Sequence, residues 1–324
     1  MPVEFAFIGA GGIATQHLDH IEDHDEATVV AVCDIDEDVA AEAAEPFDAE
    51  TYTDHEALYE AGGFDAVVIA VPPFAHEDQE KLAAEHGVDL FVEKPLALDA
   101  ETARENEEAI ENADIISQVG HMARYADSVQ RAHELIDDRT LAMVDGHWWS
   151  GLPGDSDHWW RRKELSGGQI IEQATHTYDI VRYFAGDVDT VRAAGAQKVH
   201  TDAIDFDDAT SATMTHEDGT VSTVTATSTG DQDSAHEVQL IGDGFSLHID
   251  LWGDTLSGAV DGEEVDFEGE SGTYAPEMDA FIEAVQTRDD SGLHSPYKDA
   301  RKTFETTLAV DRALDSGEPE EVGE

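Results

Sequence analysis

Short apolar runs alternate with helix-like stretches through the first third of the chain. Apolar strands are predicted at residues 3–8, 28–33, 66–71, 88–92 and 115–119, with helices ending near residue 22 and at 38–45, 76–85 and 100–112. Strands that are apolar throughout, and not only at every second position, are typical of a parallel sheet covered by helices on both faces. We therefore expect an N-terminal α/β domain with a doubly wound parallel sheet over residues 1–120.

The pattern changes after about residue 120. A predicted helix, an aromatic segment, a second helix and a long run of alternating strands follow at 126–136, 147–160, 169–185 and 188–267. Asp218-Gly219 within the strands is typical of a hairpin turn, and helices are predicted at 278–286 and 301–314. The acidic tail, 315–324, is expected to fray. The second domain, residues 121–324, is thus predicted to be α+β with a largely antiparallel open sheet.

A glycine-rich turn joins the first predicted strand to the first helix. The segment Gly9-Ala10-Gly11-Gly12-Ile13-Ala14 contains the spacing Gly9-x-Gly11-x-x-Ala14. This spacing allows a tight turn and lets a pyrophosphate approach the N–H groups at a helix N-terminus. Asp34 ends the second strand, where a carboxylate accepts hydrogen bonds from the adenosine ribose. The sequence therefore predicts a dinucleotide site, the alternative being a purely structural turn with Asp34 as an ordinary loop carboxylate.

The residues around Asp34 also bear on which dinucleotide binds. Residues 34–38 carry four acids and no base. Like charges there disfavour the 2′-phosphate of NADP. We expect NAD as the cofactor, with NADP less favoured.

Lys94 is the first candidate for catalysis. It lies in Glu93-Lys94-Pro95, directly after the strand at 88–92, the fourth strand predicted from the sequence. Ligands of open parallel sheets bind outside the carboxyl ends of the strands. A lysine beside a cationic nicotinamide has a depressed pKa that suits proton transfer. The alternative is a surface lysine, which is less expected in a chain with so few lysines.

His176 is the second candidate. Glu172, His176 and Asp179 have the i, i+4, i+7 spacing of one helical face. A carboxylate one turn from a histidine orients the ring and stabilises its charged form, so His176 is a natural general base. The alternative is a solvated polar face.

Three histidines on the first helix, His17, His20 and His24, are also regularly spaced. They have the chemistry for metal ligation. Acidic residues lie between them, so we expect an exposed polar face and no metal site.

These motifs together resemble the Gfo/Idh/MocA family, the relatives of glucose–fructose oxidoreductase and inositol 2-dehydrogenase. The resemblance covers essentially the whole chain. It includes the glycine-rich turn, Val71-Pro72-Pro73 followed by His76, Glu93-Lys94-Pro95, Arg124 after the fifth predicted strand, and Gly167-Gly168 with His176-x-x-Asp179.

The resemblance implies a Rossmann domain followed by a domain whose open sheet forms homo-oligomer contacts, in a dimer or tetramer. It implies that Lys94 is the catalytic lysine and His176 the acid/base histidine. Glu172 stands where inositol dehydrogenase-like members often carry Asp, so its side chain is one methylene longer. The cofactor contacts implied are those of Gly9, Gly11, Gly12, Ile13, Ala14, Asp34, Val71, Pro72, His76, Glu93 and Lys94.

An aromatic and basic segment precedes the His176 helix. Trp148, Trp149, Trp159 and Trp160 are followed by a cationic run at 161–163. The functional interpretation is a carbohydrate-binding wall of aromatic side chains, with the cationic run binding a carboxylate or phosphate of the substrate. The alternative is that the aromatic residues pack in the core and the cationic run is a basic patch on the surface. The substrate-binding candidates are Trp160, Arg161 and Asp179, and, by family position alone, Arg124 and Tyr125.

The predicted function is NAD(P)-dependent hydride transfer to or from a hydroxyl-bearing carbon of a sugar, polyol or inositol-like substrate. One alternative is an NAD-dependent glycoside hydrolase, because some relatives use the cofactor transiently. The other is a non-catalytic NAD-binding regulator, against which the presence of both Lys94 and His176 speaks.

Composition narrows the class of protein further. The chain has 324 residues with 74 Asp and Glu against 17 Lys and Arg, a net charge of −57. This charge excludes phosphate-tracking nucleic-acid binding and docking on anionic lipid. With 40% hydrophobic residues the chain is expected to fold. An acidic surface that repels itself at low salt predicts a cytoplasmic protein of a salt-accumulating halophile.

Three further expectations concern compartment and membrane. The single cysteine, Cys33, allows no internal disulfide and is expected to be a small buried hydrophobe. No basic region precedes the first apolar strand, so no signal peptide is expected. No apolar run approaches 18 residues, so no membrane span is expected.

Overall fold

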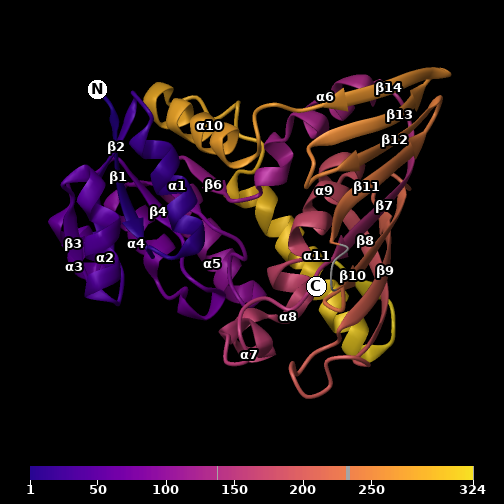
Figure 1. Ribbon diagram of the computed structural model, residues 1–324, viewed down its shortest axis with the longest axis horizontal. Helices are drawn as coiled ribbons and strands as arrows, with labels where there is room; N and C mark the ends of the chain where they lie inside the picture. The colour runs from indigo at the N-terminus through magenta and orange to yellow at the C-terminus, as the bar shows by residue number, and fades with distance from the viewer. Residues whose placement is uncertain (137, 231–233, 324) are drawn as a thin grey trace. The chain divides into compact units, whose positions relative to one another are not determined.

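The computed structural model describes residues 1–136, 138–230 and 234–323. The chain forms two compact units, shown in Figure 1. The first unit comprises Met1–Met122 and Tyr274–Arg301, and the second comprises Ala123–Thr273 and Lys302–Glu324. The sequence analysis assigned all of residues 121–324 to the second domain. The segment Tyr274–Arg301 instead packs with the N-terminal unit, because the apolar face of its helix is buried there.

The first unit is built around a six-stranded parallel sheet of order β3-β2-β1-β4-β5-β6. This order is that of a dinucleotide-binding sheet. Its elements are β1 (Val3–Ile8), α1 (Gly12–Glu22), β2 (Ala27–Cys33), α2 (Glu37–Ala44), the 3-10 turn η1 (Glu45–Phe47), β3 (Glu50–Tyr52), α3 (His55–Ala61), β4 (Ala66–Ile69), η2 (Pro73–Ala75), α4 (Gln79–His86), β5 (Asp89–Val92), α5 (Ala100–Ala113), β6 (Ser117–Val119) and α10 (Tyr274–Thr287).

Local sequence explains why these elements begin where they do. Asp36 and Asp54 accept hydrogen bonds from backbone N–H groups in the first turns of α2 and α3, and Asp99 does the same for α5. Such caps satisfy N–H groups that a helix leaves without partners, and each contributes about 1 kcal/mol. The sequence analysis missed β3 and α3, so Lys94 follows the fifth strand of the chain and not the fourth.

The core of the first unit lies between its sheet and the helices α1, α2 and α10. Phe5 and Phe7 of β1 belong to this core, together with Leu18 and Ile21 of α1 and Phe281 of α10. The rings of Phe5 and Phe281 lie 6.2 Å apart. Burial of strand residues on both faces keeps the sheet rigid, so the loops at its carboxyl edge are held in place.

The second unit is built around a nine-stranded sheet of order β14-β13-β12-β11-β7-β10-β9-β8-β15. All neighbouring strands are antiparallel except β7 and β10. The elements are η3 (Met122–Tyr125), α6 (Asp127–Ile136), β7 (Leu141–Trp149), η4 (Trp159–Arg161), α7 (Lys163–Ser166), α8 (Gly168–Glu172), α9 (Thr175–Ala185), β8 (Val188–Ala196), β9 (Ala209–His216), β10 (Val221–Thr227), β11 (Ala235–Gly242), β12 (Phe245–Asp250), β13 (Thr255–Val260), β14 (Glu263–Glu268), α11 (Tyr297–Ser316) and β15 (Glu320–Glu321). Met122 of η3 and the first turn of α11, up to Arg301, belong to the first unit.

Helices α6 and α9 pack on one face of this sheet (Figure 1). Gly146 of β7 allows α9 to come close, because a Cβ at this position would lie 2.6 Å from the methyl group of Thr177. The largely antiparallel character predicted from the sequence is confirmed, and Asp218-Gly219 forms the turn between β9 and β10.

In this unit one strand was not predicted, and two expectations are wrong. The aromatic segment was not recognised as a strand, yet β7 lies at the middle of the sheet between β11 and β10. The helix expected over 169–185 is two helices, since α8 ends at Glu172 and α9 begins at Thr175. The tail does not simply fray, because β15 pairs with β8.

Among the described residues, no helix combines the length and the apolar character needed to cross a bilayer.

Candidate functional site

The turn between β1 and α1 has the backbone geometry of a phosphate cradle. Gly9 has a φ of +88°, and a Cβ there would lie 2.4 Å from the carbonyl oxygen of Ala70, so only glycine fits. A Cβ at Gly11 or Gly12 would meet nothing within 4 Å. Among the residues that the structure describes, no side chain caps the first turn of α1. The open space above Gly11 and the uncapped N–H groups suit an anion.

Asp34 is held against this same turn. Its Oδ2 accepts a hydrogen bond from the N–H of Ala10 at 2.9 Å, and its Oδ1 accepts from the N–H of Asp36 at 3.0 Å. A carboxylate fixed in this way at the end of β2 retains lone pairs for ribose hydroxyls. The cradle and the carboxylate therefore fit the pyrophosphate and ribose of a dinucleotide. Ala14, the third position of the motif, is fully buried, which permits close packing of α1 on the sheet.

The segment after β4 contains three of the predicted cofactor contacts, and the structure gives them different neighbours. Val71 lies beside the glycine turn, with its Cγ1 3.0 Å from where a Cβ on Gly9 would be, and Pro72 precedes η2. The side chain of His76 is 1% exposed, and its Nδ1 lies 2.6 Å from Oε1 of the buried Glu80. The structure thus places Val71 at the turn and engages His76 with α4.

Glu93 and Lys94 follow β5 at the same edge of the sheet as the glycine turn and Asp34, since all three come after parallel strands. Lys94 is partly exposed. Glu93 is 4% exposed, and its Oε1 lies 2.9 Å from Nε2 of His17. His17 itself is 1% exposed. The expectation of an exposed polar face is therefore wrong for His17, because its ring faces the sheet and takes Glu93 as its partner.

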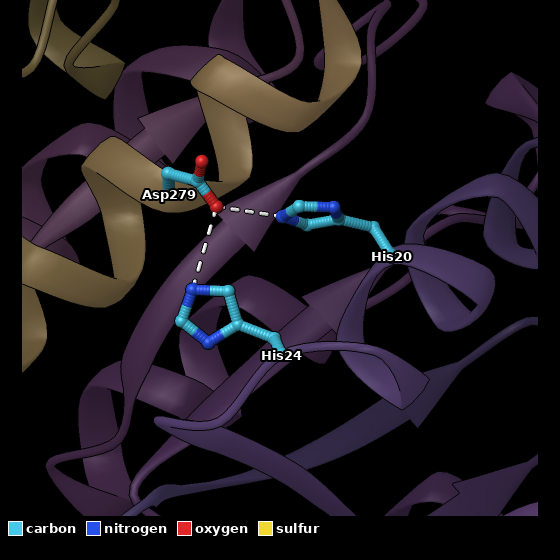
Figure 2. Close-up of side chains that lie close together, drawn as sticks. All are labelled: His20, His24 and Asp279. Carbon is cyan, nitrogen blue, oxygen red and sulfur yellow. Dashed lines mark hydrogen bonds and ion pairs between the residues drawn. The ribbon is translucent and has the colours of Figure 1, made fainter.

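The other two histidines of α1 converge on a carboxylate of α10. Figure 2 shows Nε2 of His20 and of His24 pointing at one oxygen of Asp279, at 2.6 Å and 3.5 Å. All three ligand-type atoms lie close enough to share a metal ion. However, Nδ1 of His24 accepts a hydrogen bond from the N–H of Glu26. A neutral ring whose Nδ1 accepts carries its proton on Nε2. The cluster is therefore arranged as a hydrogen-bonded clamp between α1 and α10.

In the second unit, Arg124 and Asp179 are partners of each other. Nε and Nη2 of Arg124 donate to the two carboxylate oxygens of Asp179 at 2.7 Å and 2.6 Å. Both residues are almost fully buried, and Thr303 adds a further hydrogen bond to Asp179. Two residues predicted to bind substrate are thus engaged in a bidentate ion pair that fastens α9 to the segment around η3. Tyr125 of that segment is also buried.

Glu172 and His176 do not share a helical face, since the chain turns between α8 and α9. Oε2 of Glu172 accepts a hydrogen bond from the indole N–H of Trp160 at 2.6 Å. Trp160 is 1% exposed and its ring lies edge-on to Phe206. Trp160 therefore holds the carboxylate of Glu172 through its indole N–H, and its ring is buried and not exposed for stacking.

His176 lies in an aromatic cluster formed by Trp148, His236 and Trp252. The ring of Trp148 stacks on His176 at 5.7 Å and contacts His236 at 4.8 Å, and Trp252 contacts both Trp148 and His236. Burial lowers the pKa of His236 to about 3, so this ring is neutral. Trp252 is 53% exposed, so one side of the cluster is open.

The four tryptophans singled out in the sequence do not form one wall. Trp148 and Trp149 are adjacent in β7 and therefore point to opposite faces of the sheet. Trp149 stacks on His147 at 4.7 Å, and Trp159 contacts His158. Arg161 donates to the backbone carbonyls of Asp155 and Gly154, so the expected anion handle is used to hold its own loop.

Sequence reasoning missed His236 and Trp252. His236 lies on the buried face of β11, the same face as Val238 and Leu240. A polar, titratable residue on the buried side of an alternating strand is a detectable feature. Trp252 follows β12 in a turn, and only the fold brings it to Trp148.

Comparisons with known proteins agree with this arrangement. Residues 3–121 match a family described as "Oxidoreductase family, NAD-binding Rossmann fold", and residues 129–248 match the "GFO/IDH/MocA C-terminal domain". An oxidoreductase from Agrobacterium radiobacter, in a complex with NAD+, L-tartaric acid and magnesium, has the same fold. Its TM-score is 0.90 at 20% identity, over 100% of this chain and 99% of that one.

Curated relatives that exceed 30% identity include the following two. An uncharacterised protein of Schizosaccharomyces pombe is 31% identical over 287 residues, which is 77% of this chain and 70% of the relative. A D-apiose dehydrogenase of Paraburkholderia graminis is 31% identical over 225 residues, which is 68% of this chain and 59% of the relative. The match thus spans about three fifths of the dehydrogenase.

The glycine cradle with Asp34, the order of the parallel sheet and the two consecutive family matches show that this chain belongs to the Gfo/Idh/MocA family of NAD-binding oxidoreductases.

Proposed function

We propose that the protein is an NAD-dependent dehydrogenase that oxidises a hydroxyl-bearing carbon of a sugar, polyol or inositol-like substrate. The observation that carries the proposal is the open backbone cradle at Gly11 with Asp34 fixed beside it. The named activity of a sugar dehydrogenase among the relatives supports the substrate class.

The cofactor, when bound, supplies the nicotinamide that accepts the hydride. The N–H groups at the start of α1 hold the pyrophosphate, and Asp34 holds the ribose. No base lies in residues 34–38 to pair with a 2′-phosphate, which favours NAD over NADP.

Each catalytic role follows from the chemistry of one side chain. Lys94, partly exposed at the carboxyl edge of the parallel sheet, stabilises the negative charge that develops on the substrate oxygen. His176 accepts the hydroxyl proton. We assign Arg124 and Asp179 to holding α9, and Trp160 to holding Glu172, because those contacts engage their polar groups. Trp252, exposed beside the His176 cluster, is the aromatic surface best placed to meet a sugar.

The test is a screen of sugars and polyols with NAD and with NADP, read as absorbance at 340 nm, on wild type, Lys94→Ala and His176→Ala. Net NADH should accumulate with at least one substrate, and each variant should lose about 10²–10⁴ in kcat. Turnover of glycosides without net NADH would indicate the hydrolase. NAD binding with no turnover on any substrate, unchanged in both variants, would indicate the regulator. A higher kcat/KM with NADP would contradict the cofactor preference.

We also propose that the acidic surface is an adaptation to a salt-rich cytoplasm. A net charge of −57 on 324 residues opposes compaction at low salt. About 2 M KCl shortens the Debye length to a few ångströms and should raise the melting temperature. A melting temperature that is equal or higher in low salt would contradict this proposal.

We also propose that the protein assembles into a homo-oligomer through the open face of the nine-stranded sheet. Met143 of β7 is paired in register with Val221 and Ile241 on the flanking strands, and all three side chains are exposed. Contiguous exposed apolar side chains mark interaction surfaces. Light scattering should give a dimer or tetramer for wild type and a smaller species for Met143→Glu.

A further inference from the structure

We infer that His17 is a positioning residue for Lys94, and that it acts through the carboxylate of Glu93. This inference rests on the proposed role of Lys94. Oε1 of Glu93 lies 2.9 Å from Nε2 of His17, while Oε2 accepts a hydrogen bond from the backbone N–H of Lys94 at 3.3 Å. One carboxylate therefore joins α1 to the main chain of the lysine.

The carboxylate has little freedom to move. The side chains of His17 and Glu93 are 1% and 5% exposed. A Cβ on Gly120 would lie 2.7 Å from three atoms of the Glu93 carboxyl group, so the chain at the end of β6 closes over it. The ring of His17 packs edge-on against Phe91 at 5.0 Å and against Tyr274 at 6.1 Å.

The charge of Glu93 acts on its surroundings. Burial, followed by the charges of Glu93 and Glu277, raises the pKa of Tyr274. Nδ1 of His17 is buried and has no hydrogen-bond partner among the described residues, so Glu93 is the one polar group that this ring addresses. Among the described residues, the pair's one further hydrogen bond comes from the backbone N–H of Lys94.

A buried polar pair of this kind is weak evidence for a role in stability, because replacing such pairs by apolar side chains is often neutral or stabilising. The pair lies one residue from the candidate catalytic lysine and on the helix that begins at the glycine cradle. It thus ties the backbone that approaches the pyrophosphate to the backbone that presents Lys94.

Loss of His17 has a defined consequence. A buried carboxylate that loses a donor carries a desolvation cost, which favours its taking another donor within reach. For Glu93 this is Lys94, either through a shift of its backbone or through its ammonium group, which an opposite charge attracts. Either change withdraws the lysine from the substrate oxygen. The damage should appear in kcat, because a displacement of about 1 Å can cost on the order of 10²-fold in rate.

Four variants separate this role from simple packing. His17→Leu removes the donor and keeps the bulk. His17→Gln places an N–H donor the same number of bonds from Cβ. Glu93→Gln and the double variant His17→Leu with Glu93→Gln remove the charge. His20→Leu, one turn further along α1, is the matched control, because His20 addresses Asp279 and not Glu93. Melting temperature and NAD affinity are measured for each variant, alongside kcat and KM.

His17→Leu should lower kcat by about 10–100-fold with KM for NAD changed less than about 3-fold. His17→Gln should retain kcat within about 3-fold, and His20→Leu should match wild type. Adding Glu93→Gln to His17→Leu should raise kcat to the level of Glu93→Gln alone, because no charge is left to capture the lysine. Equal losses in His17→Leu and His17→Gln, or no recovery in the double variant, would overturn the inference.

Lys94→Ala, assayed in parallel, separates the two proposals. If it keeps the wild-type kcat, the proposed function of Lys94 fails. If it abolishes turnover while His17→Leu keeps the wild-type kcat, the inference about His17 fails and the proposed function stands.

Discussion

In the first unit, backbone N–H groups contribute to holding both carboxylates at the edge of the sheet. Asp34 accepts from Ala10 and Asp36, and Glu93 accepts from Lys94 in addition to its contact with the side chain of His17. In the second unit, the polar groups around α9 are held by other side chains. Arg124 pairs with Asp179 across 55 residues of sequence, and Trp160 donates to Glu172.

This difference decides what a mutation can break. A backbone donor remains when a side chain is changed, so a substitution at Asp34 removes one group and leaves the backbone around it in place. A side-chain partner that is removed leaves the other buried and uncompensated, which costs more than the pair contributes. We therefore expect the second unit to respond in stability and the first unit, outside its tight turn, to respond in ligand binding.

The largest effect is expected from Arg124→Leu. Asp179 would lose both guanidinium bonds while 1% exposed, so its buried charge would lose its bidentate partner. We expect a loss of about 3–5 kcal/mol in unfolding free energy, measured by urea denaturation. The control is Arg131→Leu, whose partner Glu134 is 69% exposed and which should change stability by less than about 1 kcal/mol. Equal effects in the two variants would remove the contrast between the units.

The next largest effect is expected in the glycine turn, where two substitutions within the first unit can be compared with each other. Gly9→Ala forces a Cβ to 2.4 Å from the oxygen of Ala70 at a positive φ. We expect a loss of about 2–4 kcal/mol, the sum of left-handed strain and overpacking. Gly11→Ala places its Cβ in open space. It should keep stability and weaken NAD binding, measured by fluorescence titration. Unchanged NAD affinity in Gly11→Ala would contradict the cradle.

The same contrast explains what could be predicted from the sequence. The glycine turn and Asp34 are local: strand, turn, helix and acid follow each other within residues 3–34, so their chemistry is visible in the sequence. The strand β7 was missed because its aromatic residues suggested a ligand-binding segment. The turn after Glu172 was missed because helical spacing continues across it.

Pairings between residues that are far apart in the sequence could not be predicted. Arg124 and Asp179 were both recognised, but as separate substrate contacts, because nothing in the sequence says that two residues 55 positions apart neutralise each other. His17 was assigned to an exposed face because acids surround it in the sequence. Only the fold shows that its side of α1 faces Glu93.

The neutral His236 makes the second unit sensitive to acid. Burial lowers its pKa from 6.5 to about 3. The unfolded chain binds this proton below about pH 6.5 and the folded chain does not, so stability falls as the pH drops from 6.5 towards 3. Between pH 7 and pH 5 the loss is about 2 kcal/mol. Burial also lowers the pKa of His216, which adds to the loss with the same sign.

The measurement compares urea denaturation of wild type and His236→Phe at pH 7 and pH 5. The other titrating groups cancel in this comparison, so the variant should lose about 2 kcal/mol less on acidification. An identical loss in the two proteins would show that His236 is protonated in the folded state, and its burial would not be the cause of the sensitivity.

The clamp between α1 and α10 should give the smallest effect (Figure 2). Asp279 is 52% exposed, so its bonds to His20 and His24 compete with water and are screened by salt. Asp279→Asn should cost at most about 1 kcal/mol at low salt, and the difference from wild type should shrink in molar KCl. The contacts of Asp279 join two helices through side chains alone, as do the pairs of the second unit. They are nevertheless expected to contribute little to stability, because they are exposed. If Asp279→Asn lowered the unfolding free energy as much as Arg124→Leu, exposure would not explain the difference between the two carboxylates. The comparison between the units would then have to rest on the number of bonds to each carboxylate.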